Sequence, residues 1–146
     1  GCAVCLMHMQ GAPQTMQDSP AYDDVVTDVA RFLGQRAGAA MAAGVEREAL
    51  LLDPGIGFGK TLAHNLQLMA ALAHFTSLEF PILFGASRKR FIAALDDSAS
   101  EASDRLGGSL AAALHAARAG CSLIRVHDVR ETVQALKVQA AIAGAG

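Results

Sequence analysis

The chain has 146 residues, of which 52% are hydrophobic and 18% are charged, and its formal net charge is −2. These values predict one compact domain or a piece of a larger one. They give no sign of a nucleic-acid-binding or membrane protein, because no basic run exceeds residues 88–90 and no apolar run approaches the ~18 residues of a membrane span.

Short apolar runs bounded by turn residues recur along the chain, and each predicts a fully buried β-strand. The first run contains Cys2 and Cys5, whose spacing imitates a metal or redox motif but whose apolar surroundings favour two buried thiols. The odd cysteine count of three argues against a disulfide framework and fits a reducing, cytoplasmic compartment. The apolar runs span residues 2–9, 49–52, 81–84 and 121–126.

Helical patterns separate these runs. Ser19, followed by Pro20, predicts the start of the first helix, and Gly44 is placed to end it. Apolar residues at helical spacing over residues 62–73 predict the second helix.

The third helical region is interrupted. Apolar spacing predicts helix over residues 88–95 and again over 101–119, with a polar loop between them that covers no core. Asp128 and Glu131 then stand at capping-box spacing and predict the start of the last helix, a position that gives Asp128 no role beyond the cap.

The predicted order is β-α repeated four times. Buried strands that alternate with helices require a parallel sheet, covered on its outer face and joined by right-handed crossovers. Because an eight-fold barrel typically needs ~250 residues, four βα units amount to about half of one. A doubly wound open sheet is the alternative, but it usually carries a glycine-rich phosphate turn after its first strand, whereas the glycine-rich run here follows the second.

That glycine-rich run, residues 53–61 (DPGIGFGKT), imitates two phosphate-binding motifs and matches neither. Pro54 occupies the position of the first glycine of a P-loop, and Lys60 that of the third glycine of a dinucleotide fingerprint. We therefore interpret the glycines as a means of closing the backbone around a flat ligand, and Lys60 as structural.

Polar side chains follow the predicted strands where each strand ends. Asp53 follows the second strand, Ser87 and Lys89 follow the third, and Arg125 and His127 lie at the fourth. Parallel strands place these ends on one face, where barrels and open α/β sheets build their active sites. An acid, fixed cations and a histidine suit a ligand with a hydrogen-bonding ring at one end and an anionic group at the other.

Four segments, in this order, closely resemble dihydropteroate synthase of bacterial folate biosynthesis: LMHMQGAPQTMQ, LLLDPGIGFGKT, GASRKRFI and IRVHDVRETV. The resemblance implies the C-terminal half of a (β/α)8 TIM barrel, with residues 1–146 as a partial pterin-binding domain that lacks the N-terminal half. The implied reaction condenses (7,8-dihydropterin-6-yl)methyl diphosphate with 4-aminobenzoate, giving 7,8-dihydropteroate and diphosphate.

The resemblance implies four catalytic residues. Asp53 would bind the ring nitrogens of the pterin and stabilise the cation that forms when diphosphate departs. Lys89 would contact the carbonyl region of the pterin and border the aminobenzoate slot. Arg125 would stack on the pterin face and, together with His127, bind the leaving diphosphate.

It also implies four residues that bind substrate without reacting. Gly57 and Phe58 would form a wall of the pocket, Met7 would lie beneath the ring, and Ser87 would help to hold the aminobenzoate carboxylate. Sulfonamide antibacterials mimic aminobenzoate and are expected inhibitors of a complete enzyme.

Magnesium is implied for the family, but its ligand belongs to the missing N-terminal half, and no metal ligand is identified in this sequence. A homodimer is implied for the full enzyme, with small molecules as substrates. Since a half barrel leaves two strand edges unpaired, the isolated chain is expected to be inactive. The alternatives are a pterin-binding methyltransferase of the same fold and a non-catalytic pterin-binding fragment.

Overall fold

The computed structural model describes residues 1–145, in which strands and helices alternate along the chain. Short 3₁₀ turns, labelled η, lie between some of them. The elements are β1 (Val4–Met7), α1 (Val25–Ala42), η1 (Arg47–Ala49), β2 (Leu50–Asp53), α2 (Leu62–Ala70), α3 (Leu72–Thr76), β3 (Leu83–Phe84), α4 (Arg90–Ala93), η2 (Asp97–Ala99), η3 (Ala102–Arg105), α5 (Leu106–Arg118), β4 (Leu123–Ile124) and α6 (Val129–Ala143).

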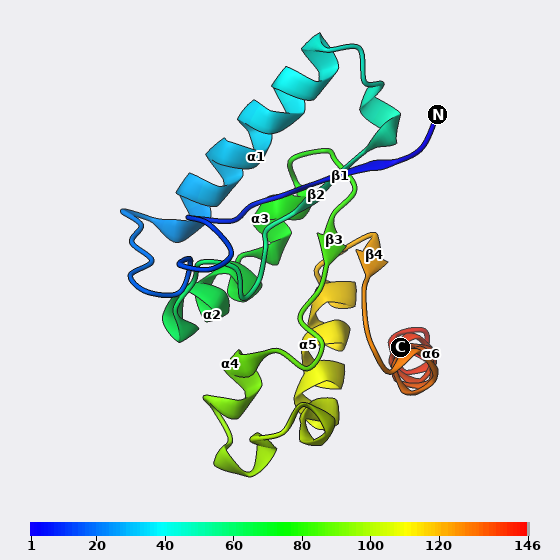
Figure 1. Cartoon of the computed structure of the whole chain (residues 1–146). Helices are drawn as coiled ribbons and strands as arrows, with labels where there is room; N and C mark the ends of the chain where they lie inside the picture. The colour runs from blue at the N-terminus through cyan, green and yellow to red at the C-terminus, as the bar shows by residue number, and fades with distance from the viewer. Residues whose placement is uncertain (146) are drawn as a thin grey trace.

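The strands are parallel and neighbour one another in sequence order. β1 pairs with β2 and β3 pairs with β4, while a parallel bridge between Leu52 and Ile82 joins the two pairs. Figure 1 shows α1 alongside β1 and β2, and α5 alongside β3 and β4. Strand order in a doubly wound sheet reverses at a switch point, whereas here it does not. The prediction of four βα units arranged as in a barrel is confirmed.

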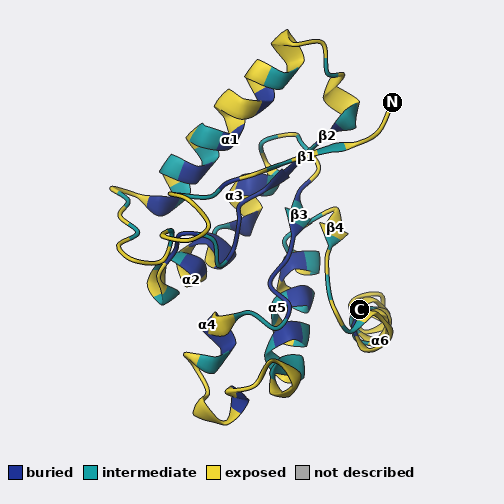
Figure 2. Cartoon of the chain, in the orientation of Figure 1, coloured by how far each residue is buried: buried dark blue, intermediate teal, exposed yellow. Residues whose placement is uncertain are grey.

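The hydrophobic core lies between the helices and one face of the sheet (Figure 2). Val25, Val29 and Leu33 recur every four residues on α1, so they share a face of the helix, and all three are buried. They pack in one cluster with Leu52 of β2 and Phe84 of β3. Complete burial of such a side chain contributes roughly 1.5–3 kcal/mol. This packing fixes the strand ends from which the site is built.

The opposite face of the sheet is exposed, which corrects the prediction that every strand is fully buried. Cys5 and Met7 of β1 and Leu123 of β4 are exposed, and Leu123 retains 46% of its accessible surface. Cys2 is exposed as well, so the prediction of two buried thiols is wrong. In a closed barrel the inner face is covered by strands across the axis, and within residues 1–145 the helices pack on the outer face alone.

The first helix begins later than predicted. Its N-cap is Asp24, whose carboxylate accepts a hydrogen bond from the Thr27 backbone at 2.7 Å. Ser19 instead donates its hydroxyl to the carbonyl of Asp18, in a turn segment that precedes the helix. The predicted end is correct, since the helix stops just before Gly44, which adopts a φ of 91°.

Two further expectations are corrected, one for the polar loop before α5 and one for the start of α6. The polar loop contains η2 and buries Ala99, whose carbonyl accepts a hydrogen bond from Arg105 at 2.9 Å, while η3 occupies the start of the helix predicted over residues 101–119. Asp128 is the N-cap of α6, but its side chain makes no cap hydrogen bond. Among the described helices, none combines the length and the hydrophobicity needed to cross a membrane.

Candidate active site

Asp53 ends β2 beside the end of β1. Its Cα is the register partner of Met7, and its carbonyl accepts a hydrogen bond from the His8 backbone at 3.0 Å. Parallel register partners share a face of the sheet, so the Asp53 and Met7 side chains lie together on the exposed inner face. Met7 therefore lies beside Asp53, and its contact with a ring stays a prediction.

The Asp53 carboxylate is 8% exposed and is held by its own loop. Burial raises its pKa, while the N–H of Gly55, at 2.7 Å from Oδ1, and the charges of Lys89, Arg125 and Lys60 act in the opposite direction. Within residues 1–145, the carboxylate accepts this hydrogen bond from Gly55 at Oδ1, and Oδ2 is available to a donor on a ligand.

Lys89 reaches across from the turn after β3 to the glycine loop. Its Nζ donates to the Ile56 carbonyl and lies 4.5 Å from the centroid of the Phe58 ring. Burial lowers the pKa of Lys89 to about 8, an effect that Asp53 opposes and Arg125 reinforces. A Cβ at Gly57 would lie 3.1 Å from Cδ of Lys89, so the absence of a side chain makes room for the lysine stem.

Arg125 and His127 follow β4 and are exposed. The Arg125 backbone continues the sheet by donating to the Phe84 carbonyl at 2.9 Å. Its guanidinium lies against Gly85, the residue that follows β3; a Cβ there would be in ordinary contact, 3.5 Å from Nε and Nη2. The structure therefore brings the two predicted anion-binding side chains to the same end of the sheet as Asp53 and Lys89.

Ser87 is buried, and its hydroxyl is engaged by His127. The His127 backbone donates to Ser87 Oγ at 3.2 Å, and Nδ1 of the ring lies 3.0 Å from the same oxygen. This geometry orients the imidazole. The role of holding the aminobenzoate carboxylate stays a prediction for Ser87, because its oxygen already has two partners on His127.

The glycines of the loop face the segment after β1, which revises our interpretation of them. A Cβ at Gly55 would lie 1.8 Å from the His8 carbonyl oxygen, and one at Gly59 would lie 2.5 Å from the Gln10 carbonyl oxygen. Both residues adopt positive φ, at 72° and 64°. They allow two backbones to approach closely, rather than closing around a ligand.

Lys60 is structural, as predicted. It is 3% exposed, and its Nζ lies 3.0 Å from Nδ1 of His8 and 2.9 Å from the Phe58 carbonyl. Three amides of the loop are also occupied: that of Gly55 donates to Asp53 Oδ1, that of Gly57 to Asn65 Oδ1 and that of Phe58 to the Gly55 carbonyl. These three amides are therefore held by contacts within the chain and are not offered to a phosphate.

The residues of this site do not fit magnesium by themselves. Magnesium prefers several oxygen ligands in octahedral geometry, whereas one carboxylate and three cationic side chains meet here. Within the part of the chain that the structure describes, no group of three or more histidine, cysteine or acidic residues could hold a metal ion.

A cavity of about 610 Å³ opens between the glycine loop and the turn after β3. Phe58 and Lys89 line it, together with Arg88 and Gln17, so it adjoins the strand-end site at Lys89. A model of the family described as "Pterin binding enzyme" matches residues 1–127. The chain belongs to the pterin-binding enzyme family.

Within this family, the chain is similar to dihydropteroate synthases. The chain is 51% identical over 138 residues to the dihydropteroate synthase of Escherichia coli K12, a match that covers 94% of this chain and 48% of the relative. A Yersinia pestis dihydropteroate synthase, solved with a sulfonamide drug complex, superposes with a TM-score of 0.93 at 48% identity, covering 99% of this chain and 52% of that one.

A third relative, the Xanthomonas albilineans dihydropteroate synthase in complex with 7,8-dihydropteroate, is 47% identical with a TM-score of 0.88. That match covers 97% of this chain and 52% of the other. The chain thus spans about half the length of the relatives it matches. The predicted fold, half of a (β/α)8 barrel, agrees with these superpositions.

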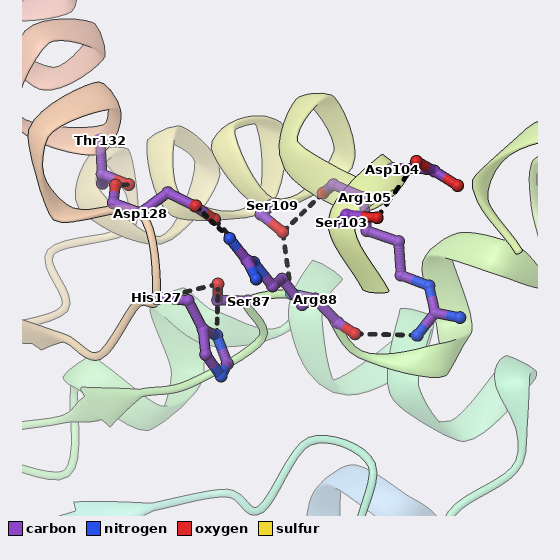
Figure 3. Close-up of polar contacts among 9 residues, drawn as sticks. All are labelled: Ser87, Arg88, Ser103, Asp104, Arg105, Ser109, His127, Asp128 and Thr132. Atoms are coloured by element: carbon purple, nitrogen blue, oxygen red, sulfur yellow. Dashed lines mark hydrogen bonds and ion pairs between the residues drawn. The ribbon is translucent and has the colours of Figure 1, made fainter. Parts of the chain in front are cut away.

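The sequence missed one set of contacts in this candidate site. Arg88 pairs with Asp128 through Nε–Oδ2 at 3.0 Å and Nη2–Oδ1 at 2.5 Å (Figure 3). The two residues are 40 positions apart, so no local pattern could reveal the pair. The Asp128 carboxylate is used by this ion pair and not by the predicted helix cap.

Acid should destabilise the fold through His8. Burial, and next the charge of Lys60, lower the pKa of His8 from 6.5 to about 4. Between these values the unfolded chain binds more protons than the folded one, so stability rises with pH across this window and is lost as pH falls through about 4. His8→Asn, which removes the titration and keeps a polar partner for Lys60, should flatten the dependence.

The measurement is the thermal unfolding midpoint at pH 7 and pH 4.5. We suggest a hybrid chain, in which residues 1–146 follow the N-terminal half of the E. coli relative. His74→Asn, at an exposed position, is the control and should keep the parent's dependence. An equal loss of midpoint in the parent and in His8→Asn would contradict the assignment.

Proposed function

We propose that this chain supplies the C-terminal half of the catalytic barrel of a dihydropteroate synthase. The reaction joins 4-aminobenzoate to (7,8-dihydropterin-6-yl)methyl diphosphate, releasing diphosphate and forming 7,8-dihydropteroate. The observation that carries the proposal is the meeting of a buried acid, Asp53, with Lys89 and Arg125 at one end of a parallel sheet.

Each side chain has a task that matches its surroundings. Asp53, with Oδ2 free of recorded partners among the described residues, accepts hydrogen bonds from the pterin ring. As the carbon–oxygen bond to diphosphate breaks, positive charge develops on the pterin, and the fixed carboxylate stabilises it. Arg125 and His127 stabilise the negative charge that leaves, and Lys89 contacts the pterin carbonyl.

The aminobenzoate is proposed to enter from the cavity of about 610 Å³ beside Phe58 and Lys89. Structures of the X. albilineans enzyme with 4-aminobenzoic acid and with 7,8-dihydropteroate support the first molecule as a substrate and the second as the product. The Y. pestis structure with a sulfonamide drug complex supports inhibition by sulfonamides.

The metal ion, the oligomeric state, the cellular location and the absence of a nucleic-acid partner are also proposals. Magnesium is proposed to be held outside residues 1–146, by the other half of the barrel. A homodimer of the complete protein is proposed through α5 and α6, since Val133, Val138 and Ile142 are exposed on α6. The cytoplasmic location and the absence of a nucleic-acid partner rest on the sequence.

The hybrid chain should form dihydropteroate from the two substrates, and residues 1–146 alone should not. The reason is that the isolated chain leaves the inner face and one edge each of β1 and β4 uncovered within its described residues. Product formation is followed by chromatography, with the unmodified E. coli relative as positive control.

The rival functions give different results. Pterin binding without any aminobenzoate binding in the presence of pterin and diphosphate, measured by calorimetry on the hybrid, would favour a pterin-binding methyltransferase or a non-catalytic fragment. Dihydropteroate formation by residues 1–146 alone would contradict the requirement for the second half.

A further inference from the structure

Arg88 lies between two residues of the site and has an unusual backbone. Its φ is 57°, in the left-handed region that non-glycine residues rarely adopt. Such conformations persist where the surrounding structure holds them, and they gather at functional sites. Ser87, which binds His127, precedes Arg88, and Lys89 follows it. The conformation of Arg88 therefore sets the directions in which both neighbours point.

Contacts from separate parts of the chain hold Arg88 in this conformation (Figure 3). Its backbone N–H donates to Ser109 Oγ of α5 at 2.8 Å, and its carbonyl accepts from Nη1 of Arg105 at 3.0 Å. Ser109 is buried, and its own hydroxyl donates to the Arg105 carbonyl at 2.6 Å. The backbone N–H and the carbonyl of Arg88 are thus both held by residues at the start of α5.

The Arg88 side chain then ties this turn to the loop after β4. Its guanidinium makes a two-point contact with the Asp128 carboxylate, at 3.0 and 2.5 Å. Asp128 is itself fixed by Thr132, whose hydroxyl donates to the Asp128 carbonyl at 2.8 Å. Because Asp128 follows His127 directly, the Arg88–Asp128 pair and the Ser87–His127 contact link the same two loops side by side.

We propose that Arg88 is a positioning residue for this active site, holding Lys89 and His127 in place through Asp128. The proposal deepens the proposed function and rests on it for the roles of Lys89 and His127. Its alternative is direct contact of Arg88 with substrate, since Arg88 also lines the cavity beside Phe58. Two-point arginine–carboxylate contacts fix geometry as well as charge, which favours the positioning role.

The test is a double-mutant cycle in the hybrid chain, with Arg88→Gln, Asp128→Asn and the two combined. We expect each single change to lower kcat by about 10- to 100-fold, the range that small misplacements of catalytic groups can produce. The double variant should fall little below either single one, because both changes break the same contact. Arg88→Lys should recover part of the loss.

Arg130→Gln, at an exposed arginine in the first turn of α6, is the matched control and should keep the parent's kcat. The second measurement does not depend on activity: the ¹H–¹⁵N resonances of the His127 imidazole should shift in the same direction in Arg88→Gln and Asp128→Asn. Thermal unfolding midpoints close to the parent's identify variants that fold.

The outcomes separate the two ideas. An inactive parent hybrid whose His127 resonances move together in both variants would contradict the proposed function and support the positioning role. A rise in KM for aminobenzoate in Arg88→Gln, with Asp128→Asn unchanged, would overturn the proposal in favour of direct substrate contact. Additive losses of kcat, or His127 resonances that move in neither variant, would overturn it as well.

Discussion

Asp53→Asn should lower the affinity of the hybrid chain for a pterin by about 100-fold, on the order of 3 kcal/mol. The amide can keep the hydrogen bond from the Gly55 N–H through Oδ1, so the loop should retain its shape. It would, however, present an NH2 group at the position of Oδ2, opposite the N–H donors of the ring. It would also remove the negative charge that faces Lys89 and Arg125.

The measurement is calorimetric titration with 6-hydroxymethylpterin, followed by steady-state kinetics. We expect kcat to fall as well, because the same carboxylate faces the cation that forms in the reaction. Asp97→Asn, at an exposed acid on η2, should leave both values unchanged. Pterin affinity that survives intact in Asp53→Asn would show that the role given to Asp53 is wrong.

Gly55→Ala should be among the most destabilising single substitutions in the chain, costing about 4 kcal/mol or more of the free energy of unfolding. The added Cβ would lie 1.8 Å from the carbonyl oxygen of His8, a backbone atom that already belongs to the β1–β2 junction. The neighbour cannot rotate away as a side chain would. The φ of 72° adds a second penalty, which any L-residue other than glycine would incur.

Gly44→Ala separates these two penalties. Gly44 has a φ of 91°, and its Cβ would meet no atom within 4 Å, so its cost should be about 1–2 kcal/mol from the backbone alone. Urea denaturation of the two hybrid variants measures the difference. Equal losses of the free energy of unfolding in Gly44→Ala and Gly55→Ala would contradict this expectation. They would mean that the loops after β1 and β2 can separate to relieve the clash at residue 55 without a further energetic cost.

Local patterns predicted the order of the elements well. Apolar runs between turn residues identified each strand, and Gly44 identified the end of α1. The same runs could not show that Cys5 and Leu123 are exposed. A strand of a barrel is apolar on both faces whether or not the strands opposite are part of the same segment, so composition alone does not reveal which face is covered.

The strand-end residues of the site were predicted because a charged side chain after an apolar run is costly without a function or a partner. The hydrogen bonds and ion pairs among the residues of the site were not predicted. Asp128 matched a cap pattern, yet a charge-assisted, two-point bond to Arg88 is stronger than a cap to a backbone amide. Ser19 matched a cap as well, while Asp24 capped the helix instead. Competition among partners is decided by tertiary contacts that short patterns do not contain.

The packing of the glycine loop also limits which of its positions can accept a side chain. Substitutions at Gly55 and Gly59 would strike backbone carbonyls of the segment after β1, which cannot move aside as a side chain can. At Gly57 a new side chain would instead meet the flexible stem of Lys89. Gly57 also has a positive φ, of 82°, so a side chain there is strained as well, and all three glycines of the loop resist substitution.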